Sequence, residues 1–176
     1  MINVIEKFAY YVSPIGPWDD YDARQKDEKE WVESLTIDDA FELLAWVKHP
    51  SPLPGWHSKS EGEIAELRDI AAQYVGRLGR RLRDDKIRIS LEALLVEPST
   101  RSSALQGLAV LGDIASVPAV SAYADEPDPV LAREIVFVLE ELGSEEAFDT
   151  LERMYERWKE HPLVGGDIRQ ALHRRL

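Results

Sequence analysis

The chain has 176 residues, of which 44% are hydrophobic and 31% charged, and it contains no cysteine. This composition is typical of a globular domain, and without cysteine the chain has no disulfides, thiolate nucleophiles or cysteine-based zinc sites. The formal net charge of −12 disfavours binding to a phosphate backbone and favours a basic partner, although acidity also serves plain solubility.

The first 60 residues predict a helical region that caps the rest of the fold. Residues 1–12 are a short apolar segment that ends at Pro14, and residues 19–35 read as a charged helix. The candidates for burial in or beside that helix are Trp18, Tyr21, Trp31, Val32 and Leu35. Thr36 and Asp39 have the spacing of a capping box, in which two side chains satisfy free amides at the start of the next helix.

A long loop ends this region, because residues 49–62 contain three prolines and two glycines. Trp56 lies in the loop and Trp46 comes just before it. Aromatic residues in long loops often form binding edges, so both tryptophans are candidate partner-binding residues. A tryptophan in this position can equally fold back onto the ends of its own helices.

The rest of the chain, residues 61–176, repeats one helical pattern. Ser60 and Glu63 form a second capping box at its start. The pattern then aligns on three leucine-glycine pairs, spaced 33 and 31 residues apart, at Leu78-Gly79, Leu111-Gly112 and Leu142-Gly143. Glycine suits the left-handed residue that ends a helix, so we expect each pair to separate two helices. We also expect a last helix over residues 167–176, capped by Asp167.

A period of this length is the sequence signature of a solenoid, in which each unit buries its apolar face against the next. The apolar positions that recur at helical spacing predict a continuous core. The residues expected in it are Ala71, Ala104, Leu108, Leu111, Leu139, Leu142 and Leu151.

The second unit, EPSTRSSALQGLAVLGDIASVPAVSAYADEPDP, resembles the short bacterial type of HEAT-like repeat, which is also found in phycobilisome lyase subunits. Arg101 matches the arginine near the start of the first helix of that repeat, and Ala104 matches its small packing residue. Pro118 matches the start of its second helix, and residues 126–129 match its link to the next repeat. The third unit departs from the pattern, because Ala132 stands at the arginine position.

The resemblance covers residues 61–176 and implies an all-α fold. The expected architecture is a short right-handed α-solenoid of about three HEAT-like helix pairs plus a terminal helix. Residues 1–60 would form an N-terminal helical cap with a proline-rich loop. The resemblance also implies that the second helix of each pair lines a concave face, which holds other macromolecules.

The sequence has no pattern typical of catalysis, a cofactor or a metal. His49, His57, His161 and His173 lack the spacing of metal ligands. Neighbouring acids on a helix point in different directions and make poor catalytic pairs. The basic cluster Arg77, Arg80, Arg81 and Arg83 is small and is followed by two aspartates, so we expect no nucleic acid partner. No apolar run is long enough to predict a membrane helix.

The second helix of the third unit carries a stripe of acids. If Phe148 and Leu151 point inward, its other side presents Glu145, Asp149, Glu152, Glu156 and Glu160. On a concave face this acidic stripe would meet a basic partner. An ordinary solvated helix face would have the same sequence, with an ion pair between Asp149 and Arg153.

These observations predict a non-catalytic protein-binding scaffold or adaptor in a bacterial-type cytoplasm, with an acidic concave surface for a basic partner. A concrete form is an immunity protein that neutralises a basic toxin domain, such as a nuclease. The alternative is an enzyme subunit or a cofactor- or ligand-handling protein, as the likeness to lyase subunits implies. A self-associating array is a third reading, because the open end of a solenoid can stack.

Overall fold

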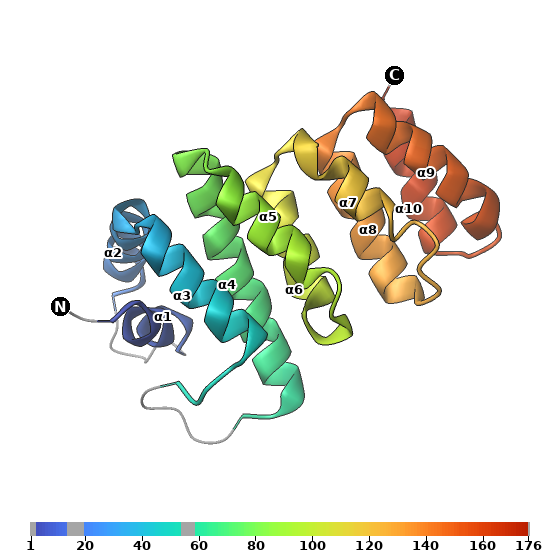
Figure 1. Cartoon of the computed structure of the whole chain (residues 1–176). Helices are drawn as coiled ribbons and strands as arrows, with labels where there is room; N and C mark the ends of the chain where they lie inside the picture. The colour runs from blue at the N-terminus through green and yellow to red at the C-terminus, as the bar shows by residue number, and fades with distance from the viewer. Residues whose placement is uncertain (1–2, 14–19, 54–58, 176) are drawn as a thin grey trace.

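A computed structural model describes residues 3–13, 20–53 and 59–175. Over these residues the chain forms ten α-helices, one short 3₁₀ turn and no strand, so the all-α class is confirmed (Figure 1). The helices are α1 (Val4–Val12), α2 (Tyr21–Ser34), α3 (Ile37–Lys48), α4 (Glu61–Leu82), α5 (Asp85–Leu94), α6 (Pro98–Leu111), α7 (Val117–Ser121), α8 (Pro129–Leu142), α9 (Glu145–Trp158) and α10 (Val164–Arg174). In this part of the chain no helix is both long and apolar enough to cross a membrane.

Both predicted capping boxes are confirmed. At the start of α3 the Asp39 carboxylate accepts a hydrogen bond from the backbone N–H of Thr36 at 2.7 Å, and the Thr36 hydroxyl accepts one in return from the Asp39 N–H. At the start of α4 the Glu63 carboxylate accepts from the Ser60 N–H at 2.9 Å, and the Ser60 hydroxyl accepts from the Glu63 N–H. These local signals fix where the two helices begin.

Two of the three marker glycines end helices as predicted. Gly112 and Gly143 have φ values of 67° and 61°, in the left-handed region that suits glycine. The third prediction is wrong, because α4 runs through Gly79 to Leu82 and Arg83 takes the left-handed conformation with a φ of 54°. A Cβ added at Gly79 would lie 2.8 Å from the Leu111 side chain, so this glycine serves close packing and not a turn.

Two further details of the prediction are corrected. Tyr21 is 55% exposed at the start of α2, whereas Trp31 and Leu35 are buried as expected. Asp167 does not cap the last helix, because α10 already begins at Val164. Trp18 lies outside the described residues.

The helices from α4 onward are arranged around one row. In this row α4, α6, α8 and α10 follow one another, and each packs on the next (Figure 1). Helices α3, α5, α7 and α9 pack against its members, with α3 on α4, α5 on α6, α7 on α8 and α9 on α10. The contacts along the row are more extensive than those between α3 and α5 or between α7 and α9.

The core is continuous along this arrangement, as the periodic apolar positions predict. All seven of the expected core residues are buried, with exposed fractions between 0% and 6%: Ala71, Ala104, Leu108, Leu111, Leu139, Leu142 and Leu151.

The N-terminal helices pack against the α4 end of the row through a cluster of aromatic rings. Phe8 of α1 makes edge contacts with Trp46 of α3 and Tyr74 of α4, at centroid distances of 5.4 Å and 6.0 Å. Tyr11 of α1 stacks on Trp31 of α2 at 4.9 Å. Edge and offset arrangements are the favoured geometries of aromatic pairs. The described part of residues 1–60 thus covers one end of the row.

The most extensive helix contact is between α4 and α6, where two glycines face each other. A Cβ added at Gly76 would overlap with the carbonyl oxygen of Gly107. One added at Gly107 would lie 2.7 Å from the Leu91 side chain and 2.9 Å from the carbonyl oxygen of Ala72. Both backbones therefore approach to a distance that only glycine permits.

Replacing Gly76 by Ala should therefore lower the free energy of unfolding by about 1–3 kcal/mol, because the added methyl group meets backbone that cannot move aside. Gly62→Ala is the matched control on the same helix, since nothing lies within 4 Å of a Cβ there. It should be neutral or stabilise by up to about 1 kcal/mol through helix propensity. Urea unfolding of both variants measures the difference, and equal stabilities would contradict the proposed role of Gly76.

Candidate functional site

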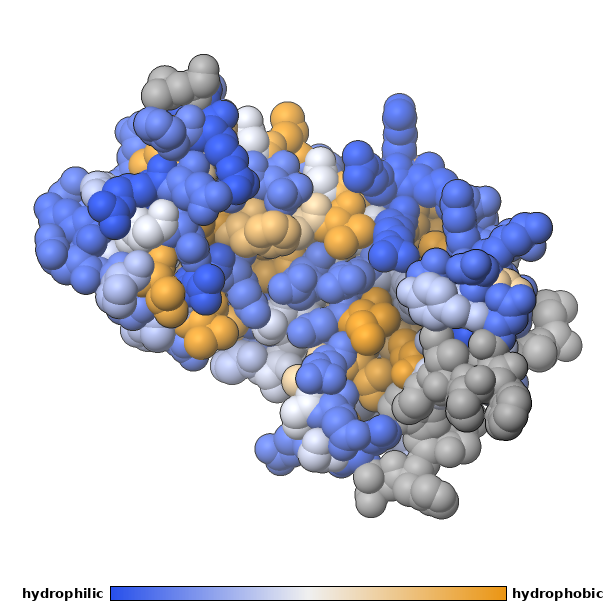
Figure 2. All heavy atoms as spheres, turned by 180° about the vertical axis from the view of Figure 1, so that it is seen from behind, coloured by the Kyte–Doolittle hydropathy of each residue, from blue (hydrophilic) through white to orange (hydrophobic). Residues whose placement is uncertain are grey.

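Apolar side chains reach the surface in separate patches among hydrophilic ones when the molecule is seen from behind (Figure 2). Two of the exposed apolar residues lie on α8, where Val130 is 64% exposed and Phe137 is 47% exposed. Glu134 lies between them along the helix. Residues at spacings of four and three share one helix face, so Val130, Glu134 and Phe137 form a single outward row, which we call the α8 stripe.

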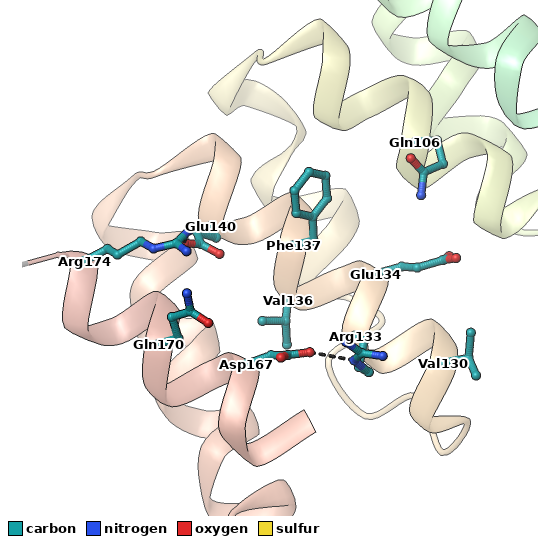
Figure 3. A pocket seen from close by; sticks show the side chains of 10 residues that line it. All are labelled: Gln106, Val130, Arg133, Glu134, Val136, Phe137, Glu140, Asp167, Gln170 and Arg174. Carbon is teal, nitrogen blue, oxygen red and sulfur yellow. Dashed lines mark hydrogen bonds and ion pairs between the residues drawn. The ribbon is translucent and has the colours of Figure 1, made fainter. Parts of the chain in front are cut away.

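The α8 stripe lies in an open pocket of about 520 Å³. Gln106 of α6 lies on the side to which Glu134 projects, and side chains of α10 lie on the other side of α8 (Figure 3). We call this hollow the α8 pocket; its lining is Gln106, Val130, Arg133, Glu134, Val136, Phe137, Glu140, Asp167, Gln170 and Arg174. The apolar side chains of the lining, Val130, Val136 and Phe137, thus lie among polar side chains from three helices.

Two ion pairs join α8 to α10 along one edge of the α8 pocket. The Arg133 guanidinium lies 2.6 Å from the Asp167 carboxylate, as the dashed line in Figure 3 shows. Arg174 pairs with Glu140 one turn beyond Phe137. Both arginines that line the pocket therefore have an acidic partner within it.

On the α6 side of α8, two serines of α6 each donate a hydrogen bond to an acid of a neighbouring helix. Ser103 donates a hydrogen bond to Asp69 of α4 at 2.6 Å, and Ser102 donates one to Glu134 of α8 at 2.9 Å. The units can be aligned on their marker glycines, Gly79, Gly112 and Gly143. Each bond then joins the residue ten positions before the glycine of one unit to the residue nine positions before the glycine of the next unit. The second carboxylate oxygen of Glu134 is buried and has no hydrogen-bond partner among the described residues.

Asp69 and Glu134 lie in a partly desolvated and negative environment. Burial is the main cause that raises the pKa of Asp69, and it also raises the pKa of Glu134. The negative charges of Asp69 and Asp128 raise the pKa of Glu134 further. The charged form of Glu134 is therefore less favourable here than in water, and a cation at this position would stabilise it.

The acidic stripe predicted on α9 lies away from this pocket. Glu145 and Glu152 both bind Arg175, and Glu156 binds Lys159 at 3.0 Å. Asp149 is exposed, and the expected pair with Arg153 is replaced by a hydrogen bond from Arg153 to the Thr150 hydroxyl. Glu145, Glu152 and Glu156 thus already have a basic partner within the chain.

Of the two candidate tryptophans, Trp46 lies among the described residues. Trp46 is 5% exposed, packs on Phe8, and donates its indole N–H to the backbone oxygen of Ser51 at 3.0 Å. The structure therefore places it in the core. Trp56 lies outside the described residues.

The basic cluster at the end of α4 is partly used within the fold. Arg81 donates to the backbone oxygen of Leu35, and Arg77 lies over the ring of Tyr74 at 5.7 Å. Both also line an open hollow of about 560 Å³ between α2 and α4, together with Glu28 of α2. Arg81 thus connects α4 to the end of α2, whereas Arg77 stacks on a residue of α4 itself.

The α8 stripe was not found from the sequence, although a signal for it exists. The buried face of α8 is formed by residues such as Ile135, Leu139 and Leu142. Val130 and Phe137 fall outside that face and remain as two apolar residues seven positions apart. Apolar residues on the polar side of an amphipathic helix are a recognisable sign of a contact surface.

No family model, curated protein or solved structure matches this chain. Among the described residues, no three histidine, aspartate or glutamate side chains gather as metal ligands would. The function of the α8 pocket therefore has to be inferred from its own residues.

The raised pKa of Glu134 predicts a pH-dependent stability. The folded state binds a proton at Glu134 more tightly than the unfolded chain does, so this residue lowers stability as the pH rises above the usual glutamate pKa of about 4.3. Glu134→Gln keeps an oxygen for the Ser102 hydroxyl and removes the charge. We expect it to raise the free energy of unfolding by less than about 1 kcal/mol at pH 7, because Glu134 is partly exposed.

The gain in the free energy of unfolding of Glu134→Gln should disappear near pH 3.5, where wild-type Glu134 is protonated in both the folded and the unfolded state. Urea unfolding at the two pH values measures it, with Asp149→Asn on α9 as the control for loss of an exposed carboxylate. A gain that is the same at both pH values would contradict the electrostatic explanation.

Proposed function

We propose that the protein is a non-catalytic binding module that holds a protein partner against the α8 stripe. The observation that carries this proposal is the exposure of Val130 and Phe137 in a pocket whose other lining side chains are mostly polar. An apolar centre with aromatic residues, surrounded by polar groups, is the usual anatomy of a protein interface. Exposing Phe137 to water is unfavourable, and a partner that covers it would relieve this cost.

We further propose that the partner presents a basic surface. The whole chain carries a net charge of −12, which attracts a basic protein over a distance. Within the pocket Arg133 and Arg174 are neutralised by their own acidic partners, whereas no positively charged residue of the described part of the chain pairs with Glu134. The local charge that remains available to a partner is therefore negative.

We also propose that the helices from α4 to α10 form a short right-handed α-solenoid of about three HEAT-like pairs plus a terminal helix. The equivalent hydrogen bonds from Ser103 to Asp69 and from Ser102 to Glu134 support this, because repeated positions then make repeated contacts. In this arrangement the face that binds would be the row of first helices, α4, α6, α8 and α10, and not the second helices that the resemblance implies. The α9 stripe would lie on the other side.

A concrete form of the proposed function is that of an immunity protein, which would hold a basic toxin domain such as a nuclease. Acidity and an exposed contact surface support that form. The alternative is a ligand-handling protein, and it is favoured by the partly buried carboxylates Asp69 and Glu134 in the same face. A small ligand would need little of the exposed apolar surface of α8, so we prefer a protein partner.

Capture of partners with the tagged full-length chain tests this proposal. Phe137→Ala should weaken the captured complex by about tenfold or more, because truncation of a buried aromatic anchor commonly costs over 1 kcal/mol. Ile89→Ala, at an exposed apolar residue of α5, is the matched control and should retain the partner. A third variant, with Asp149, Glu152 and Glu156 changed to Lys, tests whether the partner binds the acidic stripe of α9 instead of the α8 stripe.

The result expected is a partner that is lost with Phe137→Ala and kept with the other two baits. A partner lost only with the variant that carries three lysines on α9 would show that the interface lies on α9. The same partners on all four baits, the wild type included, would refute a binding role for either surface.

A further inference from the structure

The spacing of the α8 stripe matches the side of another helix. Val130, Glu134 and Phe137 stand at positions i, i+4 and i+7, so the two apolar side chains lie about 10 Å apart along the axis with the acid between them. Side chains at these spacings form the ridges by which helices pack on one another. A strand has a period of two and does not repeat this arrangement.

The surroundings of the stripe also suit a helix. Gln106 of α6 and Gln170 of α10 stand on the two sides of α8 in the α8 pocket, as Figure 3 shows. The open pocket therefore follows the α8 axis, with polar side chains along both edges. An amphipathic helix that lies along such a hollow places its apolar residues at the centre and its polar residues on the edges.

The charge within the stripe defines what the central contact must be. Glu134 accepts one hydrogen bond, from Ser102, and its second oxygen has no partner among the described residues. Asp69 accepts a hydrogen bond from the adjacent serine, Ser103, and its negative charge also acts on Glu134. A partner with an apolar or acidic residue at this point would leave the carboxylates desolvated and without a cation.

We propose that the α8 stripe receives a cationic amphipathic helix of a protein partner, with an arginine that lies against Glu134 between two apolar residues. The guanidinium group presents five donors in a fixed plane, so it can pair with the Glu134 carboxylate where that side chain lines the α8 pocket. The two flanking apolar residues cover Val130 and Phe137. This proposal rests on the proposed function and names the chemistry of the partner.

Synthetic helical peptides test it directly. The first probe is a labelled alanine-rich peptide of about 18 residues, long enough to form a helix, with Leu, Arg and Leu at positions i, i+4 and i+7. The second is identical except that Glu replaces the arginine. Binding to the full-length chain is measured by fluorescence anisotropy. The arginine peptide should bind at least about tenfold more tightly than the glutamate peptide.

A charge exchange gives the sharpest readout. Glu134→Lys should reverse the preference, so that the glutamate peptide becomes the tighter ligand. A reversal cannot result from unfolding, because an unfolded pocket loses both ligands. Asp149→Lys makes the same charge change on α9 and should leave the preference for arginine intact. Phe137→Ala should weaken both peptides.

Equal binding of the two peptides to the wild-type chain would overturn the proposal, as would an equal effect of Glu134→Lys and Asp149→Lys. Failure of this proposal is distinguishable from failure of the proposed function. A captured protein that depends on Phe137, together with peptides that do not bind, would keep the interface and refute the cationic helix. Captured proteins that are indifferent to Phe137 would remove the proposed interface and this proposal with it.

Discussion

The close approach of α4 and α6 is the constraint on which the rest of the structure depends. Gly76 and Gly107 face each other at a distance that excludes a Cβ on either helix, and Ala72 continues the same small-residue surface. This approach places Ser103 within hydrogen-bonding distance of Asp69. It also fixes α6 as the platform on which α8 packs, and so determines where the α8 stripe lies. A bulkier contact would separate these helices and shift every later member of the row.

The two ends of the row are closed by different means. At the α4 end an aromatic cluster that includes Phe8, Tyr11 and Trp31 buries large apolar surface. At the other end α10 is joined to α8 and α9 by arginine contacts, as well as by buried residues such as Ile168. Aromatic burial is insensitive to salt, whereas exposed ion pairs are screened by it. Both ends therefore contain buried apolar residues, and the α10 end is held in addition by partly exposed ion pairs.

The features that depend on local sequence could be predicted, and those that depend on neighbours could not. Capping boxes at Thr36 and Ser60 act within one turn, so sequence alone located both helix starts. Gly79 has the same local signal as Gly112, but the packing of Leu111 against it keeps α4 helical. Arg175 neutralises acids of α9 that are more than twenty residues away, and no local pattern shows this. The outward face of α8 likewise depends on having a helix on each side.

The ion pairs between α8 and α10 also make the α8 pocket depend on the C-terminal helix. Asp167 and Arg174 form one wall of the α8 pocket, so the pocket is complete only while α10 remains docked. Terminal helices held by exposed contacts are generally the first to open. A ligand that bridges α8 and α10 would therefore be linked to this local opening, and would slow amide hydrogen exchange in α10 more than in α4. Transient undocking of α10 would in turn provide a route for ligand release.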